Sequence, residues 1–248
     1  MGTALVKGKP LLRLIVVGGH TRSIGKTQLV CDVIRAFPLT DWIAGKITQY
    51  GHGVCARNGE NCDCAPTEHV CALDWETQSD TGTDTARFLQ AGAKRSFWLR
   101  TKQGYLAEGL PLLREALNSV ASGEWLVASK GDLTGGARGR PPVGDKQAVI
   151  VESNSLMQFV KPSLYFAVID PLKDDFKVSA QLALDRAQAL VMRSEIAADA
   201  PPAPLWMRLP EQLMREKPSV VQREGEKLPE PLWELVHRTL EGPPGAAI

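Results

Sequence analysis

The chain has 248 residues, enough for one large domain or for one domain with an appendage. Hydrophobic residues make up 44% and charged residues 23%, a globular composition that excludes global disorder and fibrous repeats. The net charge of +1 argues against a nucleic-acid-coating protein, and no apolar run approaches the ~20 residues that span a bilayer, so we expect a cytoplasmic protein without a membrane or nucleic-acid partner.

The first element is a β-branched apolar run over residues 12–17, which predicts a buried strand. Apolar residues at i, i+3 and i+4 spacing then predict a helix over residues 26–37, which ends before Pro38. Between them, Gly25-Lys26-Thr27 is the closing triplet of a P-loop. The usual spacing requires glycine at position 20, where this chain has His20. The loop is therefore one residue longer or His20 has an unusual backbone conformation.

A P-loop binds nucleotide phosphates through backbone N–H groups at the start of a helix. We expect Gly25 to let the backbone approach the phosphates, Lys26 to reach the β- and γ-phosphates, and Thr27 to ligate magnesium. The alternative is a strand–turn–helix junction that contains Gly-Lys-Thr by chance. The residues that we expect to bind ATP or GTP are Gly19, His20, Ser23, Ile24, Gly25, Lys26 and Thr27.

A cysteine cluster follows a second expected strand, residues 41–49. Its members are spaced C-x6-C-x-C-x6-C, and two of the four histidines, His52 and His69, lie inside or beside it. Four thiols can complete a tetrahedral site, so we expect zinc, with an iron–sulfur cluster as the alternative. Free or redox-active surface thiols are the other interpretation. The predicted ligands are Cys55, Cys62, Cys64 and Cys71.

Two carboxylates are candidates for holding the magnesium ion of a P-loop enzyme. Asp84 lies at the start of an expected helix, residues 83–93, where it would serve equally well as a helix cap. Glu152 ends an apolar strand expected over residues 148–152, although Ser153 or Asn154 could simply cap a short helix there. With Lys26, these two carboxylates are the predicted catalytic residues.

The remaining pattern alternates strands and helices, which predicts an α/β domain with a mostly parallel sheet flanked by helices. The additional strands are expected at residues 96–100, 125–129, 165–169 and 189–193, and the additional helices at 106–120 and 175–186. We expect a main domain over residues 1–193, with a Cys-rich insertion at 51–75, and a peripheral C-terminal extension over 194–248. Nine of the seventeen prolines lie between Pro201 and Pro244, and short helical patches are expected around 211–216 and 231–240.

Four stretches in this order resemble the GTP-binding adaptor family of molybdopterin-guanine dinucleotide biosynthesis, the B protein family. They are Ile15–Thr27, Ala44-Gly45-Lys46-Ile47-Thr48, Gly82-Thr83-Asp84-Thr85-Ala86-Arg87 with Ala91-Gly92-Ala93, and Ile150-Val151-Glu152. The family belongs to the P-loop class that includes metallochaperone GTPases and dethiobiotin synthetase. The resemblance implies a P-loop NTPase fold, a magnesium–nucleotide site and a partner enzyme in a cofactor pathway.

The chain differs from that family in ways that indicate a divergent member. The Lys46 segment lacks the family's histidines, and the Cys-rich insertion is not a general feature of the family. No Asn-Lys-x-Asp base-reading motif occurs; residues 189–195 stand in its place. The choice between ATP and GTP therefore stays open.

Three functions are compatible with this pattern. The first is a magnesium-dependent NTP-binding protein with slow NTP hydrolysis, which acts in the assembly of a metal or nucleotide cofactor. The second is a small-molecule kinase whose acceptor pocket is lined by Lys46, Arg138 or Arg140, although the arginines could equally be solvated loop charges. The third is a non-catalytic adaptor that binds a partner enzyme through its Pro-rich tail. A homodimer stays an open alternative.

Overall fold

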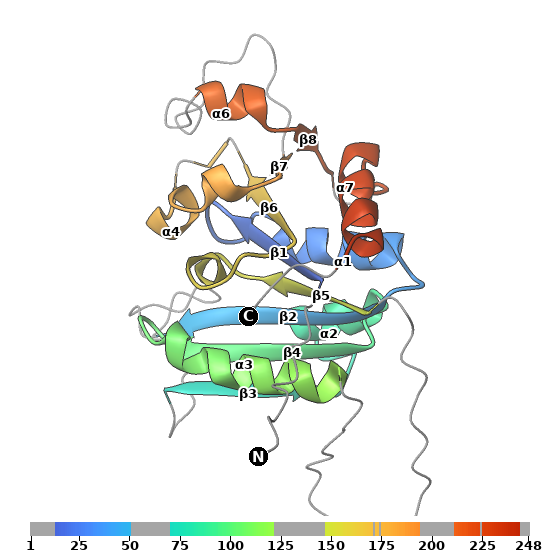
Figure 1. Cartoon of the computed structure of the whole chain (residues 1–248), viewed down its shortest axis with the longest axis vertical. Coiled ribbons are helices and arrows are strands. Elements are labelled where there is room, and N and C mark those ends of the chain that lie inside the picture. Colours follow the sequence, from blue (N-terminus) through green and yellow to red (C-terminus); the bar gives the residue numbers. More distant parts are fainter. Residues whose placement is uncertain are drawn as a thin grey trace, which may run out of the picture.

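The computed structural model describes residues 13–50, 70–121, 147–170, 172–173, 175–193, 211–223 and 225–243. The described elements form an eight-stranded sheet with helices on both faces (Figure 1). The strands are β1 (Leu14–Gly19), β2 (Asp41–Tyr50), β3 (Cys71–Glu76), β4 (Arg95–Lys102), β5 (Gln147–Glu152), β6 (Leu164–Ile169), β7 (Ala189–Met192) and β8 (Ser219–Val221). The helices are α1 (Lys26–Ala36), α2 (Asp84–Gln90), α3 (Leu106–Ala121), α4 (Val178–Gln181), α6 (Glu211–Glu216) and α7 (Glu230–Glu241), with 3-10 turns η1 (Ser155–Gln158) and η2 (Leu184–Arg186).

The order of strands in the sheet is β3-β4-β2-β5-β1-β6-β7-β8. Every neighbouring pair is parallel except β3 and β4, which are antiparallel. This confirms the predicted α/β class with a mostly parallel sheet. It also places the carboxyl ends of β1, β2, β5, β6 and β7 at one edge of the sheet, where open α/β sheets bind their ligands.

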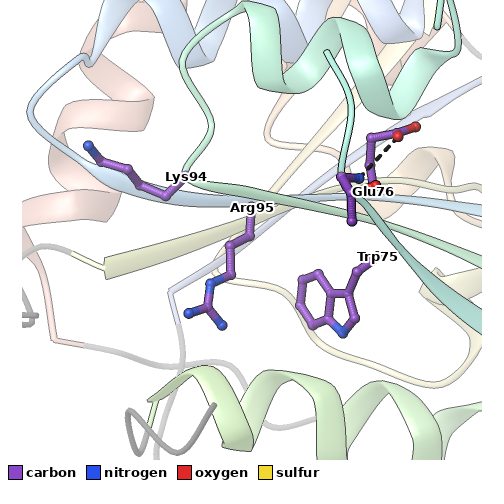
Figure 2. Close-up of a pocket in the computed structure, with 5 residues that line it drawn as sticks. Trp75, Glu76, Lys94 and Arg95 are labelled. Carbon is purple, nitrogen blue, oxygen red and sulfur yellow. Dashed lines mark hydrogen bonds between the residues drawn. The ribbon is translucent and has the colours of Figure 1, made fainter. Parts of the chain in front are cut away.

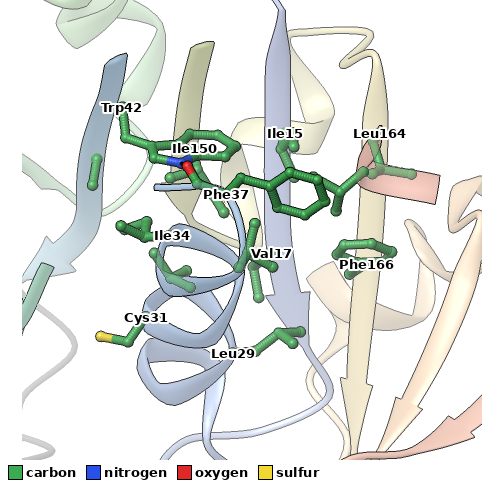
Figure 3. Close-up of a cluster of buried hydrophobic side chains, with 14 of the residues drawn as sticks. Ile15, Val17, Leu29, Cys31, Ile34, Phe37, Trp42, Ile150, Leu164 and Phe166 are labelled. Atoms are coloured by element: carbon green, nitrogen blue, oxygen red, sulfur yellow. Dashed lines mark hydrogen bonds between the residues drawn. The ribbon is translucent and has the colours of Figure 1, made fainter. Parts of the chain in front are cut away.

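Two apolar layers hold the helices on the sheet. Helices α1, α2 and α7 cover one face, and α3 covers the other together with η1 and η2. Strand β1 lies at the centre, and all six of its residues are buried, which explains its uninterrupted apolar run. Figure 3 shows the layer under α1, in which Leu29 and Ile34 of the helix pack toward Ile15 and Val17 of the strand.

The described part of the C-terminal stretch belongs to this same core. Strand β8 pairs with β7, and α7 packs beside α1 on the sheet. The fully or nearly buried side chains of α7 are Leu232, Val236 and Leu240, each worth about 1.5–3 kcal/mol when removed from water. These residues are therefore integrated in the fold, in contrast to the peripheral extension that we expected for residues 194–248.

Most expected elements occur, but the helix expected over residues 175–186 does not. Residues 175–177 are not helical, and Lys177 has an extended backbone conformation (φ −64°, ψ 137°) before the single turn of α4. The physical reason is a competing bond: the Lys177 backbone N–H donates to the His20 carbonyl oxygen at 2.9 Å instead of entering a helix.

Two strands, β3 and β8, were not expected, and the strand expected at 125–129 lies outside the described residues, as does most of the Cys-rich insertion. None of the described helices is both long and apolar enough to span a membrane.

Candidate functional site

The loop between β1 and α1 lies at the carboxyl edge of the sheet, between the ends of β5 and β6. It contains two residues with positive φ, Ser23 at 50° and Gly25 at 85°. His20 is not one of them. The departure from the usual glycine at position 20 is instead accommodated by burial: His20 is 1% exposed, and its ring packs edge-on against Phe176 at 5.7 Å. Burial lowers the pKa of His20.

The two glycines at the end of β1, which lead into the β1–α1 loop, permit close approaches that a Cβ atom would block. A Cβ at Gly19 would lie 2.5 Å from the Cδ1 atom of Ile24, which folds back over the loop and is itself buried. A Cβ at Gly18 would lie 2.6 Å from the Tyr165 hydroxyl. The loop is thus drawn tightly against the strand ends, and its backbone conformation is fixed.

Asn154 fixes the same loop by a paired amide contact. Its Oδ1 atom accepts the Gly19 N–H at 2.6 Å, and its Nδ2 atom donates to the Gly19 carbonyl at 2.6 Å. The Ser153 hydroxyl, by contrast, serves the start of η1, where it accepts the Leu156 N–H at 3.1 Å. Asn154 thus holds the end of β1, where the loop begins, against the end of β5, a role that no local sequence pattern indicates.

Gly25 is the loop position at which a side chain would be least tolerated. Its backbone is left-handed, and a Cβ there would lie 2.7 Å from Nε of Arg193, whose guanidinium covers this end of α1. Among the described residues, Nη1 of Arg193 is buried without a hydrogen-bond partner. Arg193 follows β7 directly, and β7 lies two strands from β1 in the sheet. The cation that contacts the loop therefore comes from a strand that is not adjacent to β1.

Substitution of Gly25 by alanine is expected to change the conformation of the loop and to lower the stability of the folded protein. A left-handed alanine costs about 1–2 kcal/mol, and its Cβ forces Arg193 away from the loop. Gly104→Ala is the matched control, because Gly104 also has positive φ (88°) but has open space around it. Both variants should lose stability in chemical denaturation, whereas only Gly25→Ala should lose, in calorimetry, the nucleotide binding that the sequence leads us to expect. Wild-type binding by Gly25→Ala would show that this conformation is not needed.

Lys26 and Thr27 begin α1 and face the acidic residues of neighbouring elements. The Lys26 ammonium donates to the Thr21 carbonyl at 2.8 Å, and the Thr27 hydroxyl donates to Oε2 of Glu152 at 2.6 Å. Burial lowers the pKa of Lys26, an effect that the Glu152 carboxylate partly offsets. The register places Glu152 beside Val17 of β1 and Lys46 of β2, so its carboxylate, which is 6% exposed overall, lies next to the helix start.

Asp84 comes to the same place from α2. Thr83 is the N-cap of α2, since its hydroxyl accepts the Ala86 N–H at 3.1 Å, and Asp84 is therefore not needed as a cap. Burial alone would raise the pKa of Asp84, but the Lys46 ammonium and the Thr27 hydroxyl outweigh it and hold that pKa below its usual value. The structure thus brings Lys26, Thr27, Asp84 and Glu152 close together at the start of α1.

Lys46 lies between the two carboxylates. Its ammonium forms an ion pair with Asp84 and lies 3.5 Å from Oε1 of Glu152. Burial alone would lower the pKa of Lys46, but the Glu152 and Asp84 carboxylates outweigh it and raise that pKa. A cation therefore balances the charge of the pair that we expected to face magnesium.

The donor set suits magnesium better than a transition metal. A hydroxyl and two carboxylates are hard oxygen ligands, and magnesium usually takes only one or two protein carboxylates, with water and phosphate oxygens completing its shell. Within the described ranges, no group of three or more His, Cys, Asp or Glu residues could hold a metal ion without such help.

The predicted cysteine site falls almost entirely outside the described residues. Cys55, Cys62 and Cys64 are not described, whereas Cys71 is the first residue of β3 and is partly exposed. Burial, followed by the nearby Glu108 carboxylate, raises the pKa of Cys71. Cys31, the remaining cysteine of the chain, lies on α1 and is fully buried.

A separate cavity of about 310 Å³ lies near the other edge of the sheet, where β4 begins (Figure 2). Trp75, Glu76, Thr77, Lys94 and Arg95 line it, and the side chains of Trp75 and Arg95 extend to the same side of the sheet. Glu76 also accepts the hydroxyls of Thr83 and Thr85, both at 2.9 Å, and so steadies the start of α2 that carries Asp84.

The comparisons with known proteins add no relative to this geometry. No protein-family model, no curated protein and no solved structure matches the chain.

Proposed function

We propose that this protein binds a nucleoside triphosphate with magnesium and hydrolyses it slowly, in the assembly of a metal or nucleotide cofactor. The observation that carries the proposal is the convergence of Lys26, Thr27, Glu152 and Asp84 at the start of α1, beside a loop with two positive-φ residues. A helix start with a cation, a hydroxyl and two carboxylates provides for both the phosphates and the metal.

The residues would divide the work as follows. Loop N–H groups and Lys26 bind and orient the phosphate chain. Thr27, Glu152 and Asp84 would hold magnesium, which when bound supplies charge neutralisation at the phosphates. Asn154 and Arg193 keep the loop in place, so that its amides need little reorganisation when the phosphates bind. Positioning and charge neutralisation account for the chemistry without a covalent intermediate.

Binding of magnesium by Glu152 and Asp84 requires Lys46 to give up part of its contact with them. A lysine is a point charge on a flexible stem, so its ammonium can move while the strand stays in place. Lys46 would then face the phosphates as a second cation beside Lys26. This arrangement also favours the second candidate function, a small-molecule kinase, because a cation at this place can hold an acceptor. Arg138 and Arg140 lie outside the described residues.

The test is turnover with and without magnesium. Purified protein should release inorganic phosphate from ATP or GTP slowly, and EDTA should abolish the release. A kinase would instead form diphosphate in excess of free phosphate once a metabolite pool is added. Absence of binding for both nucleotides, measured by calorimetry, would remove both candidates and leave the non-catalytic adaptor.

We also propose that Cys55, Cys62, Cys64 and Cys71 bind one metal centre, either a zinc ion or an iron–sulfur cluster. We expect sulfur–metal distances of about 2.3 Å for zinc. Mass spectrometry of anaerobically purified protein should detect the metal, and chelation should increase proteolysis near Arg57 while the sheet stays folded.

Cys31→Ala is the control for the metal measurement. Burial raises the pKa of Cys31 to about 11, so this thiol stays protonated and unsuited to a metal. Its replacement should leave the metal content unchanged, whereas Cys71→Ala should lower it. The metal site would be contradicted if the purified protein contained no metal and if chelator did not change its proteolysis near Arg57.

A further inference from the structure

A segment between β6 and α4 lies directly against the β1–α1 loop. We call its described residues, Asp170, Leu172, Lys173, Asp175, Phe176 and Lys177, the strap. The Lys173 ammonium donates to the Ser23 carbonyl at 3.0 Å, the Thr21 hydroxyl donates to the Asp175 carboxylate, and the Lys177 N–H donates to the His20 carbonyl at 2.9 Å. The Phe176 ring also packs against the His20 ring. The strap therefore contacts three of the four loop residues 20–23, namely His20, Thr21 and Ser23.

The strap adds positive charge to a loop that already has it. Lys173 and Lys177 come from the strap, Arg22 comes from the loop, and Lys26 comes from the start of α1. Burial, followed by the Arg22 and Lys26 charges, lowers the pKa of Lys177 to about 8, and only Asp175 among its main influences acts in the opposite direction. The Asp175 carboxylate is already bonded to Thr21, and that of Asp170 accepts the Leu172 N–H at 3.1 Å.

This cation cluster lies across β1 from the two carboxylates. The strap follows β6, whereas Glu152 ends β5, and β1 separates these strands. Lys46 already balances Glu152 and Asp84. The excess positive charge therefore lies on the strap side of Lys26, at the loop residues 20–23, away from the helix start that receives the inner phosphates. Gathered like charges are unfavourable until an anion joins them.

We propose that Lys177 and Arg22 bind a phosphoryl group beyond the two inner phosphates, namely the terminal phosphate of the triphosphate or the free phosphate released from it. The inference rests on the proposed nucleotide binding and adds the residues that distinguish a triphosphate from a diphosphate. Lys173 is a positioning residue, because its ammonium is used on the Ser23 carbonyl. The bonds of the strap to Thr21 and His20 keep the Lys177 stem next to the loop.

The experiment compares nucleotides in the full-length protein by calorimetry. Lys177→Gln should lower the affinity for a non-hydrolysable triphosphate analogue at least tenfold, and the affinity for the corresponding diphosphate less than twofold. Lys177→Arg should restore most of the lost triphosphate affinity. Arg22→Gln should show the same selectivity, and because Arg22 is exposed this variant does not endanger the fold. Lys161→Gln, an exposed lysine before β6, is the control that should change neither affinity.

Inorganic phosphate separates the two sources of the phosphoryl group. Phosphate that binds the wild-type diphosphate complex, but not the Lys177→Gln complex, shows that the site also takes the free ion. If Lys177→Gln lowered the affinities for triphosphate and diphosphate equally, or lowered neither, the inference would be overturned. The proposed nucleotide binding by the wild-type protein would still stand. A wild-type protein that binds neither nucleotide would overturn the proposed function itself, so the two failures are distinguishable.

Discussion

Replacement of Lys26 by alanine is expected to weaken ATP and GTP binding by about ten- to hundredfold. The ammonium faces the place where the terminal phosphates would lie, and one charge-assisted contact is worth roughly 1.5–3 kcal/mol. Within the described part of the chain this ammonium donates a hydrogen bond to the Thr21 carbonyl, at 2.8 Å, and turning from this neutral partner to a phosphate costs little. Isothermal titration calorimetry with magnesium and each nucleotide measures the change.

Lys161→Ala is the matched control for this variant. Lys161 is exposed and precedes β6, which places it at the amino edge of the sheet, opposite the β1–α1 loop. Its loss removes the same charge from the protein without touching the loop. Equal affinities for the Lys26 variant and the wild type would refute the phosphate-binding assignment, provided that circular dichroism shows a folded protein.

Replacement of Glu152 or Asp84 by alanine is expected to reduce magnesium-dependent turnover far more than nucleotide binding. Loss of one pre-positioned electrostatic group typically costs on the order of a hundredfold in rate. Glu152→Gln and Asp84→Asn keep the shape of the side chains and remove only the charge. Because magnesium then loses one of its two proposed carboxylate ligands, we expect the magnesium concentration needed for half-maximal rate to rise. Phosphate release at varied magnesium concentrations measures both effects.

Asp74→Asn provides the corresponding control. Asp74 lies on the edge strand β3, where its half-exposed carboxylate pairs with Arg100. Surface pairs of this kind contribute little, about 0–1 kcal/mol. If the Glu152 variant hydrolysed nucleotide at the wild-type rate, the carboxylate at the end of β5 would have no role in the reaction.

The local sequence pattern was sufficient to predict the elements at the centre of the sheet. Strand β1 is buried on both sides, so its sequence is a continuous apolar run, and α1 shows one apolar face because one face packs on the sheet. The site residues on these elements, Lys26, Thr27 and Glu152, follow directly from their positions at strand or helix ends. Their meeting is a consequence of parallel strands that end at one edge.

Long-range contacts decided what the sequence pattern missed. The strap leaves helical geometry to bond with His20 and Thr21, which are more than 150 residues away in the chain, and no periodicity reports such a bond. Strand β8 has three residues, too few to show a period. Asn154 looked like a cap because caps are local, whereas its actual partner is Gly19 on another strand.

The reversed direction of β3 has a consequence for how the protein can be dissected. Tyr50 ends β2 beside Lys102, and Cys71 begins β3 beside Thr101, so both ends of the intervening chain are fixed on neighbouring residues of β4. Two strand spacings separate these ends, about 10 Å. A few residues can bridge that gap, and the entropic cost of closing a loop changes only slowly with its length. Residues 51–69, the part of the Cys-rich insertion that precedes Val70 and β3, can therefore be shortened or exchanged without breaking a described strand pairing. Such a variant lets the proposed nucleotide binding be studied apart from Cys55, Cys62 and Cys64.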